Sequence, residues 1–143
     1  VDFIRLTKEL DQSLSGISAD RPKEERTKYA SFNDLSNITK AFVLYDREVA
    51  VGCAAFKKYA TDTAEVKRVF ICEKYRGKGL SKMLLSELEK QVRKEGFKRL
   101  ILETGKNNRA AVSMYKSIDY REIDNFIPYT DMEDSICFSK DLY

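Results

Sequence analysis

Two glycines and three basic side chains are concentrated between residues 76 and 82 (RGKGLSK), just before leucines that recur at helical spacing. The first N–H groups of a helix have no partner within the helix and carry partial positive charge, so they bind phosphate where the chain permits close approach. Gly77 and Gly79 permit that approach. Positive charge is added by Arg76, Lys78 and Lys82. The segment therefore predicts a phosphate-binding turn between a strand and a helix.

The spacing of these residues distinguishes among known phosphate loops. A Walker A loop has the pattern G-x-x-x-x-G-K-[ST], and a dinucleotide-binding fingerprint has a third glycine at the position of Lys82, so neither fits. Residues 76–81 instead resemble the Arg/Gln-x-x-Gly-x-Gly/Ala loop of the GNAT acyltransferase superfamily, which binds the pyrophosphate of acetyl-coenzyme A (acetyl-CoA). Ser81 stands at the last position of this pattern and is small enough to keep the close approach.

A second segment resembles the same family. Residues 108–115 (NRAAVSMY) and the following 118–120 (IDY) are similar to the family's Asn-x-x-Ala-x-x-x-Tyr…Gly-Phe segment. Asp119 replaces the glycine, and aspartate tolerates a left-handed turn better than most residues do. Because the two motifs occur in the family's order, separated by the expected helix and strand, the resemblance to GNAT N-acetyltransferases covers most of the chain.

The resemblance implies a site for acetyl-CoA as cosubstrate, built by the loop, the strand before it and the helix of the second motif. The residues that it assigns to this site are Val69, Phe70, Ile71, Arg76, Gly77, Lys78, Gly79, Leu80, Ser81, Lys82, Asn108 and Tyr115. In the family, a backbone N–H of the strand polarises the thioester carbonyl, which requires no particular side chain. Asn108 has an alternative interpretation as an ordinary helix N-cap, and the two roles are compatible.

The absence of histidine restricts the groups that can move protons. It excludes Ser-His-Asp and Cys-His catalysis and His-ligated metal sites, and we expect no metal. Tyr115 matches the family tyrosine that protonates the leaving thiolate, and its alternative interpretation is a core residue on the apolar face of its helix. Cys72 has no histidine to activate it and is expected to be structural.

A carboxylate, acting directly or through water, is the expected base for an ammonium substrate. Glu103 resembles the glutamate of ribosomal-protein N-terminal acetyltransferases, and Glu65 resembles that of histone-acetyltransferase-type members. The alternative for each is a strand-end carboxylate paired with a nearby basic residue. Those basic residues are Lys67, Arg68, Lys98 and Arg99. The sequence leaves Glu103, Glu65 and water open as the base.

The acceptor amine is not defined by the sequence. The candidates for the walls of its pocket are Tyr29, Phe32, Phe126, Pro128 and Tyr129. A small amine, such as an amino acid, polyamine or antibiotic, and a protein α-amino group or lysine all remain open. Two other functions are alternatives: a non-catalytic acyl-CoA-binding regulatory domain, and a nucleic-acid-binding domain. The second is disfavoured because a net charge of +3 is small and the aromatic-basic pattern of RNA-binding modules is absent.

The composition is that of a globular domain, and we expect residues 1–143 to form a single one. Hydrophobic residues make up 43% of the chain, with no apolar run near the roughly 20 residues that a membrane span needs. Three cysteines without a C-x-x-C pair indicate reduced thiols, and with no signal-peptide pattern they favour the cytoplasm. Dimerisation is common among GNAT relatives, and the sequence leaves the possibility of a homodimer open.

The elements that must position these residues alternate between strands and helices. Apolar runs and alternation predict strands at residues 3–6, 41–45, 49–56, 64–71, 99–104, 120–123 and 135–139. Capping signals and apolar spacing predict helices after residue 7, over 22–32, over 80–95 and from 108 to 118. Glu89 and Arg93 are expected to pair on a solvent-exposed face. This order implies a mixed α/β fold, with a mostly antiparallel central sheet of about six to seven strands, one parallel crossover and about four flanking helices.

Overall fold

The computed structural model describes residues 3–5 and 38–143, which contain a six-stranded sheet. The strands are β1 (Lys40–Asp46), β2 (Val49–Ala60), β3 (Thr63–Ile71), β4 (Arg99–Gly105), β5 (Arg121–Ile123) and β6 (Ser135–Asp141). The helices after residue 38 are the short 3-10 helix η1 (Glu73–Tyr75), α3 (Leu80–Lys94) and α4 (Arg109–Ser117). The predicted mixed α/β class is confirmed.

The N-terminal predictions have a different outcome. Residues 3–5 are helical, so the strand predicted there is wrong. Arg5 Nη2 donates to Ala50 O at 2.9 Å, so this segment contacts the sheet through a side chain instead of through strand pairing. The helices predicted between residues 7 and 32 lie outside the described residues. Within residues 3–5 and 38–143, no helix is both long and apolar enough to cross a membrane.

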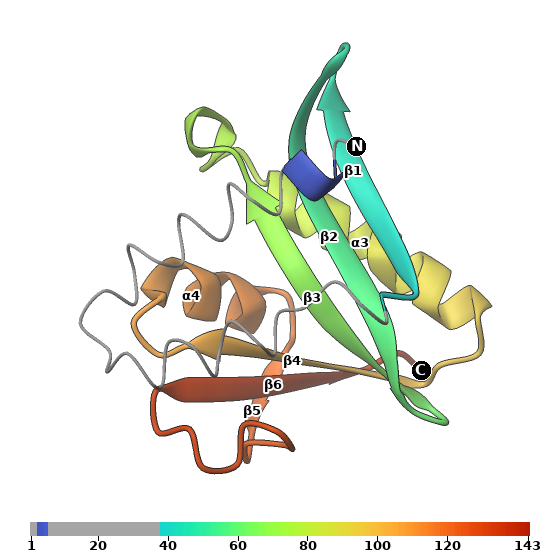
Figure 1. Ribbon diagram of the computed structural model, residues 1–143, viewed down its shortest axis with the longest axis vertical. Helices are drawn as coiled ribbons and strands as arrows, with labels where there is room; N and C mark the ends of the chain where they lie inside the picture. The colour runs from blue at the N-terminus through green and yellow to red at the C-terminus, as the bar shows by residue number, and fades with distance from the viewer. Residues whose placement is uncertain (1–2, 6–37) are drawn as a thin grey trace.

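The sheet has the order β1-β2-β3-β4-β6-β5, in which β3 and β4 run parallel and the other four neighbouring pairs are antiparallel. The parallel pairing extends only from Thr63↔Arg99 to Glu65↔Ile101. Beyond these residues the two strands diverge, and α4 lies beside the opening between them (Figure 1). The sheet therefore consists of two halves, β1-β2-β3 and β4-β6-β5, joined at one end.

β3 carries a β-bulge in the part that no longer pairs with β4. The register with β2 shifts between Cys53 and Ala55, so that Ala54 faces both Arg68 and Val69. Arg68 has a φ of 60°, in the left-handed region that costs a non-glycine residue about 1–2 kcal/mol. A bulge bends its strand and redirects the backbone groups around it. The end of β3 therefore runs in a different direction from the first part of β3, which pairs with β4.

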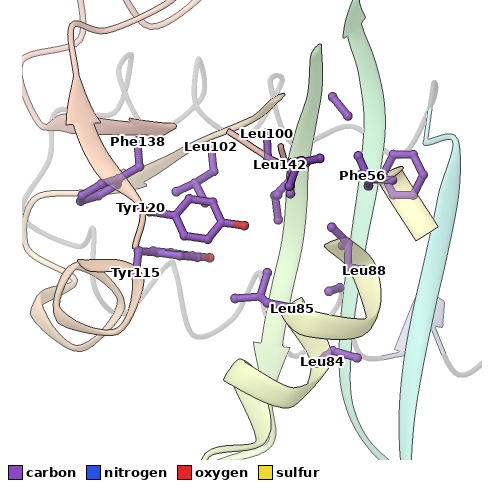
Figure 2. Close-up of a cluster of buried hydrophobic side chains, with 14 of the residues drawn as sticks. Phe56, Leu84, Leu85, Leu88, Leu100, Leu102, Tyr115, Tyr120, Phe138 and Leu142 are labelled. Carbon is purple, nitrogen blue, oxygen red and sulfur yellow. The ribbon is translucent and has the colours of Figure 1, made fainter. Parts of the chain in front are cut away.

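The hydrophobic core lies between the sheet and the two helices and spans both halves. Its labelled members in Figure 2 are Phe56, Leu84, Leu85, Leu88, Leu100, Leu102, Tyr115, Tyr120, Phe138 and Leu142. The leucines of α3 recur at the predicted helical spacing and pack on the half that contains β2 and β3. Each fully buried Leu or Phe contributes about 1.5–3 kcal/mol. The core fixes how the two halves meet.

A buried carboxylate also joins the two halves on this face of the sheet. Glu89 of α3 is 6% exposed, and it accepts hydrogen bonds from Tyr120 Oη at 2.9 Å and from Lys140 Nζ at 3.0 Å. Arg93 Nε instead donates to Leu142 O at 2.9 Å. The prediction of a solvent-exposed Glu89–Arg93 pair is wrong, because the partners of Glu89 come from elements that the helix pattern does not contain.

We expect Glu89→Ala to lower the free energy of unfolding by about 3 kcal/mol, because it leaves the Tyr120 hydroxyl and the Lys140 ammonium without their buried acceptor. Glu87→Ala is the matched control on the same helix. Glu87 is 60% exposed and bonded to Lys90, so its loss should cost about 0.5 kcal/mol or less. Urea denaturation of both variants measures the difference. Equal losses would contradict the stabilising role of the buried network.

Candidate functional site

The segment that connects β3 to α3 is open and ends on unbonded helix N–H groups. Gly77 and Gly79 have φ values of 77° and 76°, and a Cβ atom at either would meet nothing within 4 Å. Gly79 is the N-cap of α3, and Met83 N donates to Gly79 O at 3.2 Å. The N–H groups that precede this bond, and so have no partner in the helix, are those of Leu80, Ser81 and Lys82. They form a site suited to an anion.

The basic side chains of this segment have different surroundings. Arg76 Nε donates to Ile71 O at 2.7 Å, and its guanidinium lies 5.4 Å from the centre of the Phe70 ring. These contacts hold the segment against the end of β3. Lys78 and Lys82 are exposed beside the glycines. Lys78 Nζ lies 5.5 Å from the centre of the Tyr75 ring, so both lysines place positive charge beside this helix end.

The end of β3 borders the opening between the two halves. Its pairing with β4 stops at Glu65, so within the described residues the later part of β3 has no strand neighbour on that side. This later part includes Val69, Phe70 and Ile71. An unpaired strand edge binds an extended ligand through main-chain hydrogen bonds. Here that edge is followed by η1 and the glycine turn, which lead to the N-terminus of α3.

α4 brings two polar side chains to the other side of the opening. Asn108 Oδ1 accepts from Ala111 N at 3.3 Å and caps the helix, which confirms the N-cap interpretation. Tyr115 is 6% exposed, with its ring centre 5.5 Å from that of Tyr120, and the hydroxyls of both tyrosines point toward α3 (Figure 2). Burial, and then the Glu103 carboxylate, raise the pKa of Tyr115, so its hydroxyl remains protonated at neutral pH.

The sheet face away from α3 carries buried charge where the β3–β4 pairing ends. Glu65 is 2% exposed, and its oxygens lie 3.5 Å from Lys67 Nζ and 3.8 Å from Lys57 Nζ. Lys67 also donates to Tyr129 Oη at 3.0 Å. Burial lowers the pKa of Lys67, and the Glu65 carboxylate opposes that effect. Glu65 thus lies in an ion-pair cluster that connects β2 and β3 to the loop between β5 and β6.

Glu103 lies on β4 at the same opening, and Ser135 Oγ donates to it at 2.6 Å. Its carboxylate raises the pKa of three groups around it, those of Tyr115, Lys67 and Cys137. Burial is the main cause that brings the pKa of the Cys137 thiol to about 11, so this thiol is neutral at physiological pH. Glu103 is therefore electrostatically coupled both to the α4 side and to the β3 side of the opening.

A hollow of about 440 Å³ lies beside Ser135, next to the loop between β5 and β6. The carboxylates among its lining residues are Glu122, Asp124, Asp131 and Glu133. Lys106 also lines it. The excess of negative charge makes this surface attractive to ammonium groups.

Comparison with known proteins agrees with this geometry. The sequence profile described as "Acetyltransferase (GNAT) family" matches residues 4–120. The chain belongs to the GNAT acetyltransferase family. Both resemblances seen in the sequence lie within the matched residues, so the GNAT motifs and the GNAT profile describe the same part of the chain.

Individual GNAT relatives extend this result. A Xenopus tropicalis protein named Probable N-acetyltransferase 14 is 29% identical to this chain over 102 residues. These residues are 69% of this chain and 48% of that protein, so the chain spans about half of this relative's length. A Klebsiella pneumoniae structure described as a "putative acyl-CoA N-acyltransferase" is 28% identical to this chain, with a TM-score of 0.80. The match covers 100% of this chain and 91% of the Klebsiella chain. The PaiA N-acetyltransferase of Thermoplasma acidophilum, in complex with coenzyme A, shares the fold at 19% identity, with a TM-score of 0.73 and coverage of 98% and 92%.

The predicted acceptor residues of this chain are described only in part. Tyr29 and Phe32 lie outside the described residues. Pro128 is exposed, whereas Tyr129 is 2% exposed and bonded to Lys67. The sequence interpretation also missed Ser135. Its position in the alternating stretch at residues 135–139 is the signal that places it on the face of β6 that Glu103 occupies on β4.

Proposed function

We propose that this chain transfers the acetyl group of acetyl-CoA to a primary amine, by direct attack of the amine within a ternary complex. The observation that carries the proposal is the open glycine turn at the start of α3 beside the unpaired edge of β3. This arrangement suits a long ligand with phosphates at one end: the phosphates meet the N–H groups of residues 80–82, and an extended arm pairs with residues 69–71. The coenzyme A complex of the T. acidophilum relative supports the same ligand.

The chain's own groups are suited to the acyl-transfer step. Bound acetyl-CoA supplies the thioester and its leaving thiolate. Backbone N–H groups near the bulge at Arg68 stabilise the negative charge that develops on the carbonyl oxygen. Tyr115 holds its proton at neutral pH and donates it to the departing sulfur.

We assign Glu103 as the base. Glu65 is 2% exposed and lies between two ammonium groups, which is the geometry of a structural ion pair. Glu103 is half-buried at the opening and coupled to Tyr115, the proposed proton donor. An amine that loses its proton to Glu103 would then attack a thioester whose sulfur is near Tyr115.

The test of this function is acetyl-CoA turnover with acceptors of different classes. The panel contains an alanine-initiated peptide, an N-terminally blocked lysine peptide, spermidine, an amino-acid mixture and an aminoglycoside. A thiol reagent follows release of CoA, and mass spectrometry identifies the acetylated amine. We expect CoA release that depends on the amine and is matched by acetylated product. Tight acetyl-CoA binding with no product from any amine would contradict the proposal and favour the non-catalytic regulatory domain.

A further inference from the structure

A short hydrogen bond connects Glu103 to the first residue of β6. Ser135 Oγ lies 2.6 Å from Glu103 Oε2, and Ser135 is 2% exposed. Glu103 faces Cys137 and Gly105 faces Ser135, so the serine is the diagonal neighbour of the glutamate on the same face of the sheet. A hydroxyl that donates to a carboxylate at this distance makes a charge-assisted hydrogen bond, roughly twice as strong as a neutral one.

The loop between β5 and β6 holds Ser135 in this position. Asn125 Nδ2 lies 3.3 Å from Ser135 O, 3.1 Å from Met132 O and 3.2 Å from Tyr129 O. Ser135 N donates to Met132 O at 3.0 Å. One side-chain amide therefore gathers three carbonyl groups, and the serine backbone is bonded through both its N–H and its C=O. The loop therefore fixes the backbone position from which the Ser135 hydroxyl projects.

Several charged or titratable groups act on the same space. In the described part of the chain they include Lys57 and Tyr59 from β2, Glu65 and Lys67 from β3, Tyr115 from α4, Tyr129 from the loop between β5 and β6, and Cys137 from β6. An ammonium beside a carboxylate favours the ionised form and so lowers the affinity of the carboxylate for the proton that a base must accept. The Ser135 hydroxyl is a neutral donor, so it orients Glu103 and leaves the carboxylate its negative charge.

We propose that Ser135 is a positioning residue for Glu103. The Ser135 hydroxyl fixes the orientation of the Glu103 carboxylate and keeps it ionised for proton abstraction. The proton of the acceptor ammonium would pass to the carboxylate held in this orientation. This inference rests on the proposed function, in which Glu103 is the base.

The first measurement follows the Glu103 carboxyl carbon by NMR through a pH titration, with Glu103→Gln identifying its signal. We expect the midpoint to rise by about one pH unit in Ser135→Ala, because the carboxylate loses a donor that favours its charged form. Ser135→Thr keeps a hydroxyl and should keep the midpoint. Ser139→Ala is the matched control, since Ser139 is also 2% exposed on this face of β6 but faces Ile101. An unchanged midpoint in Ser135→Ala overturns the proposal.

The second measurement is the pH profile of kcat/KM for acetyl transfer to the alanine-initiated peptide, or to the panel amine that turns over fastest. In Ser135→Ala the acid limb should move up by about one pH unit, which is about a tenfold loss on that limb. The KM for acetyl-CoA should not change. In a Glu103→Gln background, Ser135→Ala should have no further effect. A tenfold loss in that background as well would show that the serine acts through the fold, and would overturn the positioning role.

The Glu103→Gln variant separates failure of this inference from failure of the proposed base. A decrease in kcat of about a hundredfold supports Glu103 as the base. If Glu103→Gln turns over at the wild-type rate, Glu103 is not the base and the inference about Ser135 fails with it. The proposal of acetyl transfer would not be affected by that result. A slow Glu103→Gln with an unshifted acid limb in Ser135→Ala overturns the positioning role alone. If Ser135→Ala does not fold, Ser135→Cys, of similar size but with a weaker donor, carries the same test.

Discussion

Gly79→Glu is expected to weaken acetyl-CoA binding by about a thousandfold. Gly79 is the N-cap of α3, so the new carboxylate would lie at the helix end where the phosphates are proposed to bind. A negative charge about 4 Å from a phosphate charge costs about 4 kcal/mol at the effective dielectric of a protein surface, which corresponds to about a thousandfold in affinity. The carboxylate would also accept the helix-end N–H groups for itself. Isothermal titration calorimetry with acetyl-CoA measures the loss.

Gly96→Glu is the matched control for this substitution. Gly96 has a φ of 91° just beyond the other end of α3, and a Cβ atom there would also meet nothing within 4 Å. Both variants force a side chain into the left-handed region, at about 1–2 kcal/mol, and both add one negative charge. We expect Gly96→Glu to bind acetyl-CoA as the wild type does. Equal binding by the wild type and Gly79→Glu would contradict the placement of the phosphates at this helix end.

Tyr115→Phe is expected to lower kcat by about a thousandfold with little change in the KM for acetyl-CoA. The substitution removes the proposed proton donor, and a positioned general acid or base contributes typically about 10²–10⁴. The ring keeps its packing against Tyr120 and Phe138, so the free energy of unfolding should change by less than about 1 kcal/mol. Steady-state kinetics with the amine from the panel and thermal unfolding measure the two effects.

Tyr120→Phe should give the opposite result. Tyr120 is 3% exposed, and its hydroxyl donates to the buried Glu89 carboxylate at 2.9 Å. Its loss should destabilise the fold by about 1.5–3 kcal/mol, as expected for a hydrogen bond to a charged group, while kcat stays within about twofold of the wild type. Normal turnover by Tyr115→Phe would remove Tyr115 as the proton donor. A large decrease in kcat for Tyr120→Phe would mean that the rate also depends on the Tyr120 hydroxyl and its bond to Glu89, and not on the Tyr115 hydroxyl alone.

The same assignment predicts the alkaline side of the pH profile. Because burial raises the pKa of Tyr115 above its ordinary value of about 10, the hydroxyl keeps its proton as the pH rises through that value. The wild-type kcat should therefore show no loss between pH 8 and about 10 from ionisation of this tyrosine. A decline in that range that disappears in Tyr115→Phe would contradict the assignment.

Much of the fold could be predicted because its signals are local. The glycines at 77 and 79 and the stop at Gly96 lie where the chain takes positive φ values, which few other residues adopt. Asn108 caps α4 through an atom only three residues from its partner, Ala111. Each of these signals acts within about one turn of the chain, so it can be recognised without knowing what packs against it. The same holds for the two GNAT motifs.

The bulge in β3 and the buried charges could not be predicted in this way. Arg68 takes a left-handed φ that its own side chain does not favour, because the register with β2 imposes an extra residue there. Glu89 follows the pattern of an exposed helix position, yet it is buried by Lys140, 51 positions away, and by Tyr120, 31 positions away. A helix pattern shows which side faces a core and not which charges that core supplies.

By itself the sequence determined the fold class, the glycine turn before α3 and the family, because each depends on short patterns of residue type and spacing. Only the tertiary structure decided which carboxylate is enclosed by ammonium groups and which is held by a hydroxyl. Glu65 meets Lys57 and Lys67, whereas Glu103 meets Ser135, 32 positions away. The physical reason is that the partners of a buried charge are set by the register and packing of distant strands, which no local pattern records.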